Sequence, residues 1–331
     1  MSYMKGVEDI LQALIRLALH RRASDIHLIR QGNSLQIALR QNDQLVPVAQ
    51  DIWDGELFEY LKFRAGMDLT RPSDPQSGRF AVDGMSCRFA VLSGSGKENG
   101  VLRLLNTRSD LDIDDLSDRK DVTDFLHHLC SWRQGLVLFT GPTGSGKTTT
   151  LHAILRQASL AFHHKCVSLE DPVEIADDAY IQLAVNKSTG LTYEQGIEEL
   201  LRHDPDVICI GETRSPAVCR KIFTASLTGH FTLSTIHAKD GRDCLYRLMD
   251  MGITPAQIRE QVSAIISQRL YENPQTKRKV CLHEIITRQD IQEILETGQY
   301  PIHVRKLEDL VWEAAQNGTV PHWQAAQDFP R

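Results

Sequence analysis

The chain has 331 residues, of which 41% are hydrophobic and 24% charged, so its composition is that of a soluble globular protein with material for about two domains. Its net charge of −6 gives no general attraction to nucleic-acid phosphates, and we therefore expect no direct nucleic-acid binding. No apolar run approaches the roughly 18–20 residues of a membrane span, and the N-terminus lacks the pattern of a signal peptide, which predicts a cytoplasmic protein.

The first third of the chain combines helix and strand signals. Apolar residues recur at helical spacing over residues 7–18, and residues 26–30 and 35–40 then alternate as two strands. Residues 80–105 also have strand character, broken by the loop at 93–97. These patterns predict a small α+β domain over residues 1–118.

An acidic segment, residues 109–121, follows these strands and contains few apolar residues. Its charges are expected to remain solvated. We therefore predict a domain boundary near residue 118, with residues 119–133 as a linker and residues 134–331 as the second domain.

The second domain alternates between short apolar runs and helical stretches. The strand signals lie at 136–139, 167–169, 207–210 and 231–236. A capping box at Thr192 and Gln195, and Ser215 before Pro216, mark two helix starts. Apolar strands between helices predict an α/β domain with a mostly parallel sheet buried on both faces.

A phosphate-binding motif follows the first of these strands and precedes a helical run. It matches G-x-x-x-x-G-K-[ST] and consists of Gly141, Pro142, Thr143, Gly144, Ser145, Gly146, Lys147 and Thr148. The glycines allow backbone N–H groups to turn towards phosphate, Lys147 reaches the β- and γ-phosphates, and Thr148 offers a hydroxyl to Mg²⁺. The expected ligand is therefore ATP with Mg²⁺.

A second acidic signal ends the strand at 207–210. Glu212 follows Gly211 there and would lie at the carboxyl edge of the sheet, where Mg²⁺ bound to a nucleotide is expected. We interpret Glu212 as the Walker B acid and, with Thr148, as part of the metal site.

The order of motifs between residues 134 and 270 resembles that of the type II secretion and type IV pilus ATPases. Residues 169–175 resemble the Asp box of that family, residues 204–214 its Walker B region, and residues 228–237 its His box. The resemblance implies that the second domain is a RecA-like P-loop ATPase domain.

Each box carries an implied role. Glu174 would be the general base that polarises the attacking water, and Glu170 and Asp171 remain alternatives for orienting water or Mg²⁺. His230 and His237 belong to the His box, and the sensor role is assigned to His237. Glu212 completes the set of catalytic acids.

The first domain has a resemblance of its own. Residues 23–27, Ala-Ser-Asp-Ile-His, resemble the signature that opens the N-terminal domain of the family, and Arg88 and Arg103 fall on arginines that this domain uses. An arginine supplied on closure stabilises charge on the γ-phosphate, which would link hydrolysis to movement.

Within the family, the short chain is most similar to the competence pilus assembly ATPases. The extra N-terminal domain and the four-cysteine zinc module of the large export ATPases have no counterpart, and the C-terminal signature of retraction ATPases has no clear match. The resemblance implies a homo-hexamer, peripheral to the cytoplasmic membrane, that acts with an inner-membrane platform protein. A retraction ATPase, a nucleotide-gated scaffold with little turnover, and a nucleic-acid motor are the alternatives.

Overall fold

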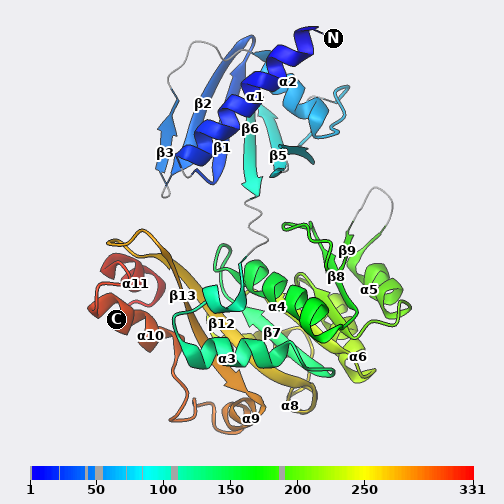
Figure 1. Cartoon of the computed structure of the whole chain (residues 1–331), viewed down its shortest axis with the longest axis vertical. Coiled ribbons are helices and arrows are strands. Elements are labelled where there is room, and N and C mark those ends of the chain that lie inside the picture. Colours follow the sequence, from blue (N-terminus) through cyan, green and yellow to red (C-terminus); the bar gives the residue numbers. More distant parts are fainter. Residues whose placement is uncertain are drawn as a thin grey trace. The chain divides into compact units, whose positions relative to one another are not determined.

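The computed structural model describes residues 2–21, 23–41, 44–48, 55–71, 73–83, 85–105, 111–185 and 191–331. The chain forms two compact units, Met1–Thr107 and Arg108–Arg331, and each is described by itself (Figure 1).

The first unit is an antiparallel sheet with helices on one face (Figure 1). The strand order is β3-β2-β1-β6-β5-β4. The strands are β1 (Asp25–Gln31), β2 (Ser34–Gln41), β3 (Gln44–Pro47), β4 (Gln76–Val82), β5 (Met85–Gly94) and β6 (Lys97–Leu105). Ile26 and Leu28 point to the same face of β1 and are buried with α1 (Ser2–His20) and α2 (Gly55–Arg64). Asp25 and His27 therefore lie on the other face.

The second unit is built on a seven-stranded sheet of order β13-β12-β7-β11-β10-β8-β9. The strands are β7 (Gly135–Thr140), β8 (Cys166–Glu170), β9 (Ile181–Ala184), β10 (Val207–Ile210), β11 (Phe231–Ile236), β12 (Val262–Glu272) and β13 (Lys279–Thr287). All neighbouring pairs are parallel except β12 with β13. The predicted α/β fold, with its mostly parallel sheet, is confirmed.

Helices bury both faces of this sheet. On one face Val137 and Phe139 pack with α3 (Lys120–Leu129) and α4 (Lys147–Phe162). On the other face Leu136 and Leu138 pack with a larger set of helices. That set is α5 (Tyr193–Leu201), α6 (Pro216–Leu227), α7 (Gly241–Asp250), α8 (Pro255–Gln261) and α9 (Arg288–Thr297). The alternation explains the continuous apolar runs in the sequence, because both faces of each strand are buried.

The predicted helix starts at α5 and α6 are confirmed. Thr192 accepts a hydrogen bond from the Gln195 amide and completes a capping box, and the Ser215 side chain caps α6 with Pro216 in its first turn. Two further helices, α10 (Leu307–Gln316) and α11 (His322–Asp328), form a smaller cluster with Tyr271 of β12.

The acidic segment belongs to the second unit. The units divide between Thr107 and Arg108, eleven residues before the predicted boundary of residue 118. The predicted linker 119–133 contains α3, and its residues Val122, Leu126 and Leu129 are fully buried. Their spacing is that of one helical face, and the charges around it conceal the pattern in the sequence.

None of the helices in the described part of the chain has both the length and the apolar character needed to cross a bilayer.

Candidate nucleotide site

Four neighbouring parallel strands bring the predicted site residues to one edge of the sheet. The phosphate loop follows β7, Glu212 follows β10, and His237 follows β11. Glu170 is the last residue of β8. Because these strands are parallel and adjacent in the order β7-β11-β10-β8, their carboxyl ends lie together. The edge therefore joins segments that are up to 100 residues apart in the chain.

The phosphate loop, residues 141–146, has the backbone that only glycine adopts readily. Gly141, Gly144 and Gly146 have φ angles of 147°, 80° and 91°. A Cβ atom on Gly141 would lie 2.5 Å from the carbonyl oxygen of Gln268 and 2.6 Å from Oγ of Ser145. Pro142, Thr143 and Gly144 are exposed at the tip of the loop. The loop leads directly into α4, whose free N–H groups suit an anion.

Lys147 is folded back on its own loop. Its Nζ donates hydrogen bonds to the carbonyl oxygens of Gly141 (2.9 Å) and Pro142 (2.8 Å), and the residue is 8% exposed. Burial lowers the pKa of Lys147 to about 8; the charge of Glu212 opposes this shift, that of Arg269 adds to it, and that of Glu174 opposes it. The lysine is thus still mainly a cation at neutral pH, and it interacts electrostatically with the carboxylates of Glu212 and Glu174.

Glu212 lies between the side chains of Arg214 and His237. Its Oε2 lies 2.6 Å from an Arg214 guanidinium nitrogen, and its Oε1 lies 3.1 Å from Nε2 of His237. The hydrogen bond to Glu212 raises the pKa of Arg214. The loop itself is fixed because the Thr213 amide donates to the Thr235 carbonyl at 2.7 Å. Glu212 and His237, predicted separately from two motifs, are therefore direct neighbours.

The three acids of the Asp box have different surroundings. Glu170 is turned inwards, where its carboxylate accepts hydrogen bonds from Ser168 (2.6 Å) and Gln182 (3.2 Å), and burial raises its pKa. Asp171 lies 3.8 Å from Arg214. Glu174 is exposed, and among the described residues no side chain forms an ion pair with it. Of the three, Glu174 is the carboxylate most open to a water molecule.

Thr148 lies in the first turn of α4 and is half-buried. Together with Glu212 it offers the hydroxyl and carboxylate oxygens that Mg²⁺ prefers. Within the described ranges, no group of three or more His, Cys, Asp and Glu side chains is placed to hold a metal ion by itself. This donor set fits a cation that is bound mainly through the phosphates of a nucleotide.

The two predicted arginines lie in the first unit. Arg88 of β5 is the direct cross-strand partner of Arg103 of β6, so both point to the face without helices. Arg103 also forms an ion pair with the buried carboxylate of Asp25 at 2.7 Å. The structure thus places the two arginines side by side.

The two histidines of the His box lie at opposite ends of one strand. His230 directly precedes β11 and hydrogen-bonds to Thr228 at 2.9 Å, whereas His237 follows β11 at the edge with the phosphate loop. A strand of this length separates them by roughly 20 Å. Only His237 belongs to the nucleotide edge of this chain.

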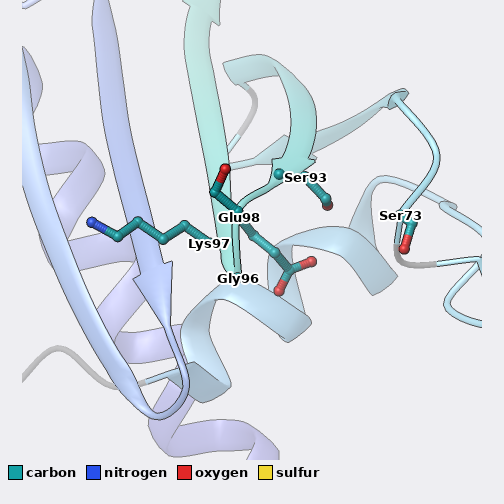
Figure 2. Close-up of a pocket in the computed structure, with 7 residues that line it drawn as sticks. Ser73, Ser93, Gly96, Lys97 and Glu98 are labelled. Carbon is teal, nitrogen blue, oxygen red and sulfur yellow. The ribbon is translucent and has the colours of Figure 1, made fainter.

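A second Gly-Ser-Gly-Lys sequence, residues 94–97, has a different structure. It forms the turn between β5 and β6, with Gly94 paired to Lys97. Next to it lies an open pocket of about 380 Å³, and Figure 2 shows Lys97 extending away from Ser73, Ser93 and the carboxylate of Glu98. That carboxylate is engaged by Lys62 and Arg30. The turn is not a phosphate loop.

Sequence reasoning missed the side chains of Gln268, Cys281 and His283 beneath the phosphate loop, which we call its floor. Gln268 is fully buried, and its Nε2 donates to Oγ1 of Thr150 in α4 (2.8 Å) and to Nε2 of His283 in β13 (2.9 Å). Sγ of Cys281 lies 3.8 Å from the Ser145 carbonyl oxygen. Burial lowers the pKa of His283 to about 4. No local pattern links positions 118 residues apart, so these contacts carried no sequence signal.

Arg269, next to this floor, is held by the C-terminal helices. Its guanidinium donates to the carbonyl oxygens of Gln268 (3.1 Å) and Lys239 (3.0 Å) and lies 3.6 Å from the Asp328 carboxylate. Phe329 is 1% exposed, and the charged groups of Arg269 and Lys239 lie 5.3 and 5.1 Å from the centroid of its ring. The end of α11 is therefore joined to the nucleotide edge.

The fold and this edge together define a P-loop protein, and comparison with known proteins gives the family. The family model described as "Type II/IV secretion system protein" matches residues 3–310, and the chain belongs to that family.

Two competence proteins ComGA are among its relatives. The one from Bacillus subtilis is 34% identical over 81% of this chain and 77% of its own length, and the one from Halalkalibacterium halodurans is 37% identical over 81% and 79%. The Escherichia coli "Protein transport protein HofB homolog" is 37% identical over 96% of this chain, which spans 65% of that protein. The predicted similarity to competence pilus ATPases is confirmed.

Solved structures support the fold. The pilus retraction motor PilT with bound ADP superposes with a TM-score of 0.74 over 96% of both chains, at 24% identity. The Legionella pneumophila ATPase DotB gives a TM-score of 0.75 over 96% of this chain and 94% of its own, at 18% identity.

Proposed function

We propose that the protein hydrolyses ATP as a homo-hexameric motor that drives assembly of a type IV-like competence pilus used for DNA uptake. The observation that supports this most is the meeting of a complete phosphate loop with Glu212 and His237 at one sheet edge. The membership in a secretion ATPase family and the relatives named competence protein support the cellular role.

In this proposal the phosphate loop and the start of α4 bind the ATP phosphates through backbone N–H groups. Lys147 leaves the carbonyl oxygens of Gly141 and Pro142 to contact the β- and γ-phosphates. Thr148 and Glu212 would hold Mg²⁺, which neutralises charge on the phosphates when bound. Glu174 accepts the proton of the attacking water.

His237 and Arg214 share the carboxylate of Glu212 in the structure. A change in the contacts of that carboxylate on hydrolysis would release or reorient the imidazole of His237. This exchange of partners is the physical basis that we propose for His237 as a sensor of the nucleotide state.

Arg88 and Arg103 supply the coupling to movement. As neighbours on one sheet face they present two positive charges, which suits the charge that develops on the γ-phosphate oxygens. We propose that they reach the nucleotide only in a closed arrangement, so that hydrolysis and domain movement occur together. An inner-membrane platform protein of the pilus machine would receive the movement at the cytoplasmic face of the membrane.

Steady-state phosphate release by the purified protein distinguishes an ATP-hydrolysing enzyme from a nucleotide-gated scaffold, which would release little phosphate.

Arg103→Ala tests the role of the arginines. This variant is expected to leave nucleotide affinity nearly unchanged and to slow hydrolysis by roughly 10²-fold or more, because arginine fingers contribute rate factors of roughly 10³–10⁵ elsewhere. Mixing Arg103→Ala with Lys147→Ala chains should restore some activity if the site is completed between subunits. Normal hydrolysis by Arg103→Ala, or mixed rings that assemble but remain inactive, would contradict closure between subunits.

The assembly role needs a test in cells. A deletion strain imaged for surface pili and assayed for DNA uptake should lack both if the protein drives assembly, whereas loss of a retraction motor leaves pili present. The likeness to the retraction motor PilT, at 24% identity, supports the fold and leaves the direction of movement to this experiment.

A further inference from the structure

One glutamine connects both ends of the loop that carries Glu174, residues 171–180. The loop joins β8 to β9, and Gln182 is the second residue of β9. The Nε2 of Gln182 donates to the Ile175 carbonyl oxygen (2.8 Å), to the Glu170 carboxylate (3.2 Å) and to the Tyr180 hydroxyl oxygen (3.2 Å). Its Oε1 accepts a hydrogen bond from the Asp177 amide at 2.9 Å. A single planar amide group thus contacts Glu170, which directly precedes the loop, and residues of the loop that follow Glu174.

Glu170 extends this support to Glu174 itself. Its carboxylate accepts hydrogen bonds from the hydroxyl of Ser168, from Gln182 and from the backbone N–H of Glu174. The Glu174 side chain is exposed, whereas the backbone on both sides of it is hydrogen-bonded. The backbone that carries the Glu174 carboxylate is therefore held in place by hydrogen bonds.

A second set of contacts ties the same loop to the helix that begins at Lys147. The carboxylate of Asp177 is 3% exposed and lies 2.6 and 3.2 Å from nitrogens of Arg156 and His152, both in α4. It also accepts a hydrogen bond from the Ala179 amide at 2.8 Å. The loop that carries Glu174 is therefore attached to α4, the helix that begins at the phosphate loop.

We infer that Gln182 is a positioning residue for Glu174, holding the carboxylate at a fixed place relative to the phosphate loop. The inference rests on the proposed function, in which Glu174 activates the attacking water. A general base must lie within hydrogen-bond reach of its proton, and a shift of about 1 Å reduces rates by up to about 10²-fold. The hydrogen bonds of Gln182 to Glu170, Ile175 and Asp177 oppose such a shift.

Gln182→Leu removes all of these hydrogen bonds and tests the inference. We expect kcat to fall about 10- to 10²-fold while the KM for ATP changes little, because the phosphate loop is untouched. The matched control is Gln157→Leu in α4, which should hydrolyse ATP normally; among the described residues, the one side-chain hydrogen bond of Gln157 is with His127 at 2.8 Å. If Gln182 acts through Glu174, the double variant Glu174→Ala with Gln182→Leu should be no slower than Glu174→Ala alone.

Gln182→Glu serves where the leucine variant does not fold. It keeps the size of the side chain and an acceptor for the Asp177 amide but loses the donors to Ile175 and Glu170, so it should show the same loss in kcat. Wild-type turnover in a folded Gln182 variant, or losses that multiply in the double variant, would overturn the inference.

Amide hydrogen exchange separates this inference from the proposed enzyme activity. In Gln182→Leu the Asp177 amide loses its acceptor, and exchange in a peptide covering the loop should accelerate at least about tenfold, with Gln157→Leu unchanged there. A chain that releases no phosphate would defeat the proposed function and leave this measurement valid. Unchanged exchange in the loop would show that Gln182 does not hold it.

Discussion

The sequence Gly-Ser-Gly-Lys occurs twice in the chain, at residues 94–97 and 144–147, and the two copies have different structures. Both contain residues in the left-handed region, with φ of 73° at Gly96 and of 80° and 91° at Gly144 and Gly146. The first copy turns from one strand into its antiparallel neighbour, whereas the second passes from a buried parallel strand into a helix.

The difference shows what a phosphate site requires beyond its residues. In the hairpin, the backbone pairs across the turn, and the side chain of Lys97 extends away from Ser73 and Ser93 (Figure 2). In the phosphate loop the following helix presents free N–H groups, and Lys147 is buried near Glu212 and Glu174. The floor of the phosphate loop lies under the second copy.

The largest contrast is expected between the two lysines. Lys147→Ala should abolish ATP turnover, because the phosphates lose their direct cation, whereas Lys97→Ala should hydrolyse ATP as the wild type does. The fold should survive Lys147→Ala, since burying this charge is unfavourable and the pKa of Lys147 is lowered accordingly. Phosphate release and thermal unfolding of both variants measure the two effects. Equal turnover in the two variants would contradict the assignment of the phosphate loop.

The floor beneath the loop predicts a pH effect on stability. The pKa of His283 is about 4 in the folded chain, against 6.5 for an ordinary histidine, because burial disfavours the imidazolium. Between pH 6.5 and 4 the unfolded chain therefore binds a proton that the folded chain does not, and the free energy of unfolding should fall by up to about 3 kcal/mol as the pH falls.

Urea unfolding of the second unit at several pH values tests this effect. His283→Gln should show a smaller loss of stability between pH 6.5 and 4 than the wild type, and the exposed His203→Gln should resemble the wild type. An unchanged pH dependence in His283→Gln would show that another group titrates in this range.

The smallest contrast concerns the first glycine of each loop. Gly141→Ala is expected to destabilise the fold by about 1–3 kcal/mol, because its φ is 147° and the new Cβ would meet the Gln268 carbonyl oxygen at 2.5 Å. Gly94 has nothing within 4 Å of its Cβ position, so Gly94→Ala should change stability by no more than about 0.5 kcal/mol. Chemical denaturation of both variants makes the comparison, and equal losses would contradict the close packing of Gly141.

The sequence predicted those parts of the site whose residues lie close together in the chain. The phosphate loop and Glu212 were predictable because a strand, a turn and a functional residue follow one another within a few positions. The neighbours of Glu212 were less visible, since Arg214 and His237 gain their significance from the pairing of β10 with β11.

Residues that act over long separations were not predictable. The bond from Gln268 to Thr150 joins positions 118 residues apart, and the contacts of Gln182 depend on the way the loop returns to β9. Helix α3 was missed because Asp121 and Asp124 surround a three-residue apolar face in a segment rich in acids. In each case, the information lies in tertiary packing rather than in local pattern.

The contact of Phe329 with Arg269 has a mechanical consequence. Asp328 and Phe329, at the end of α11, both contact the guanidinium group of Arg269. That guanidinium donates a hydrogen bond to the carbonyl oxygen of Gln268, the same atom against which Gly141 is packed. A force that displaces α11 from the sheet must either break the contacts with Arg269 or move Arg269 as well. Load on the C-terminal helices is thereby transmitted, over two side chains, to the strand end beside the phosphate loop.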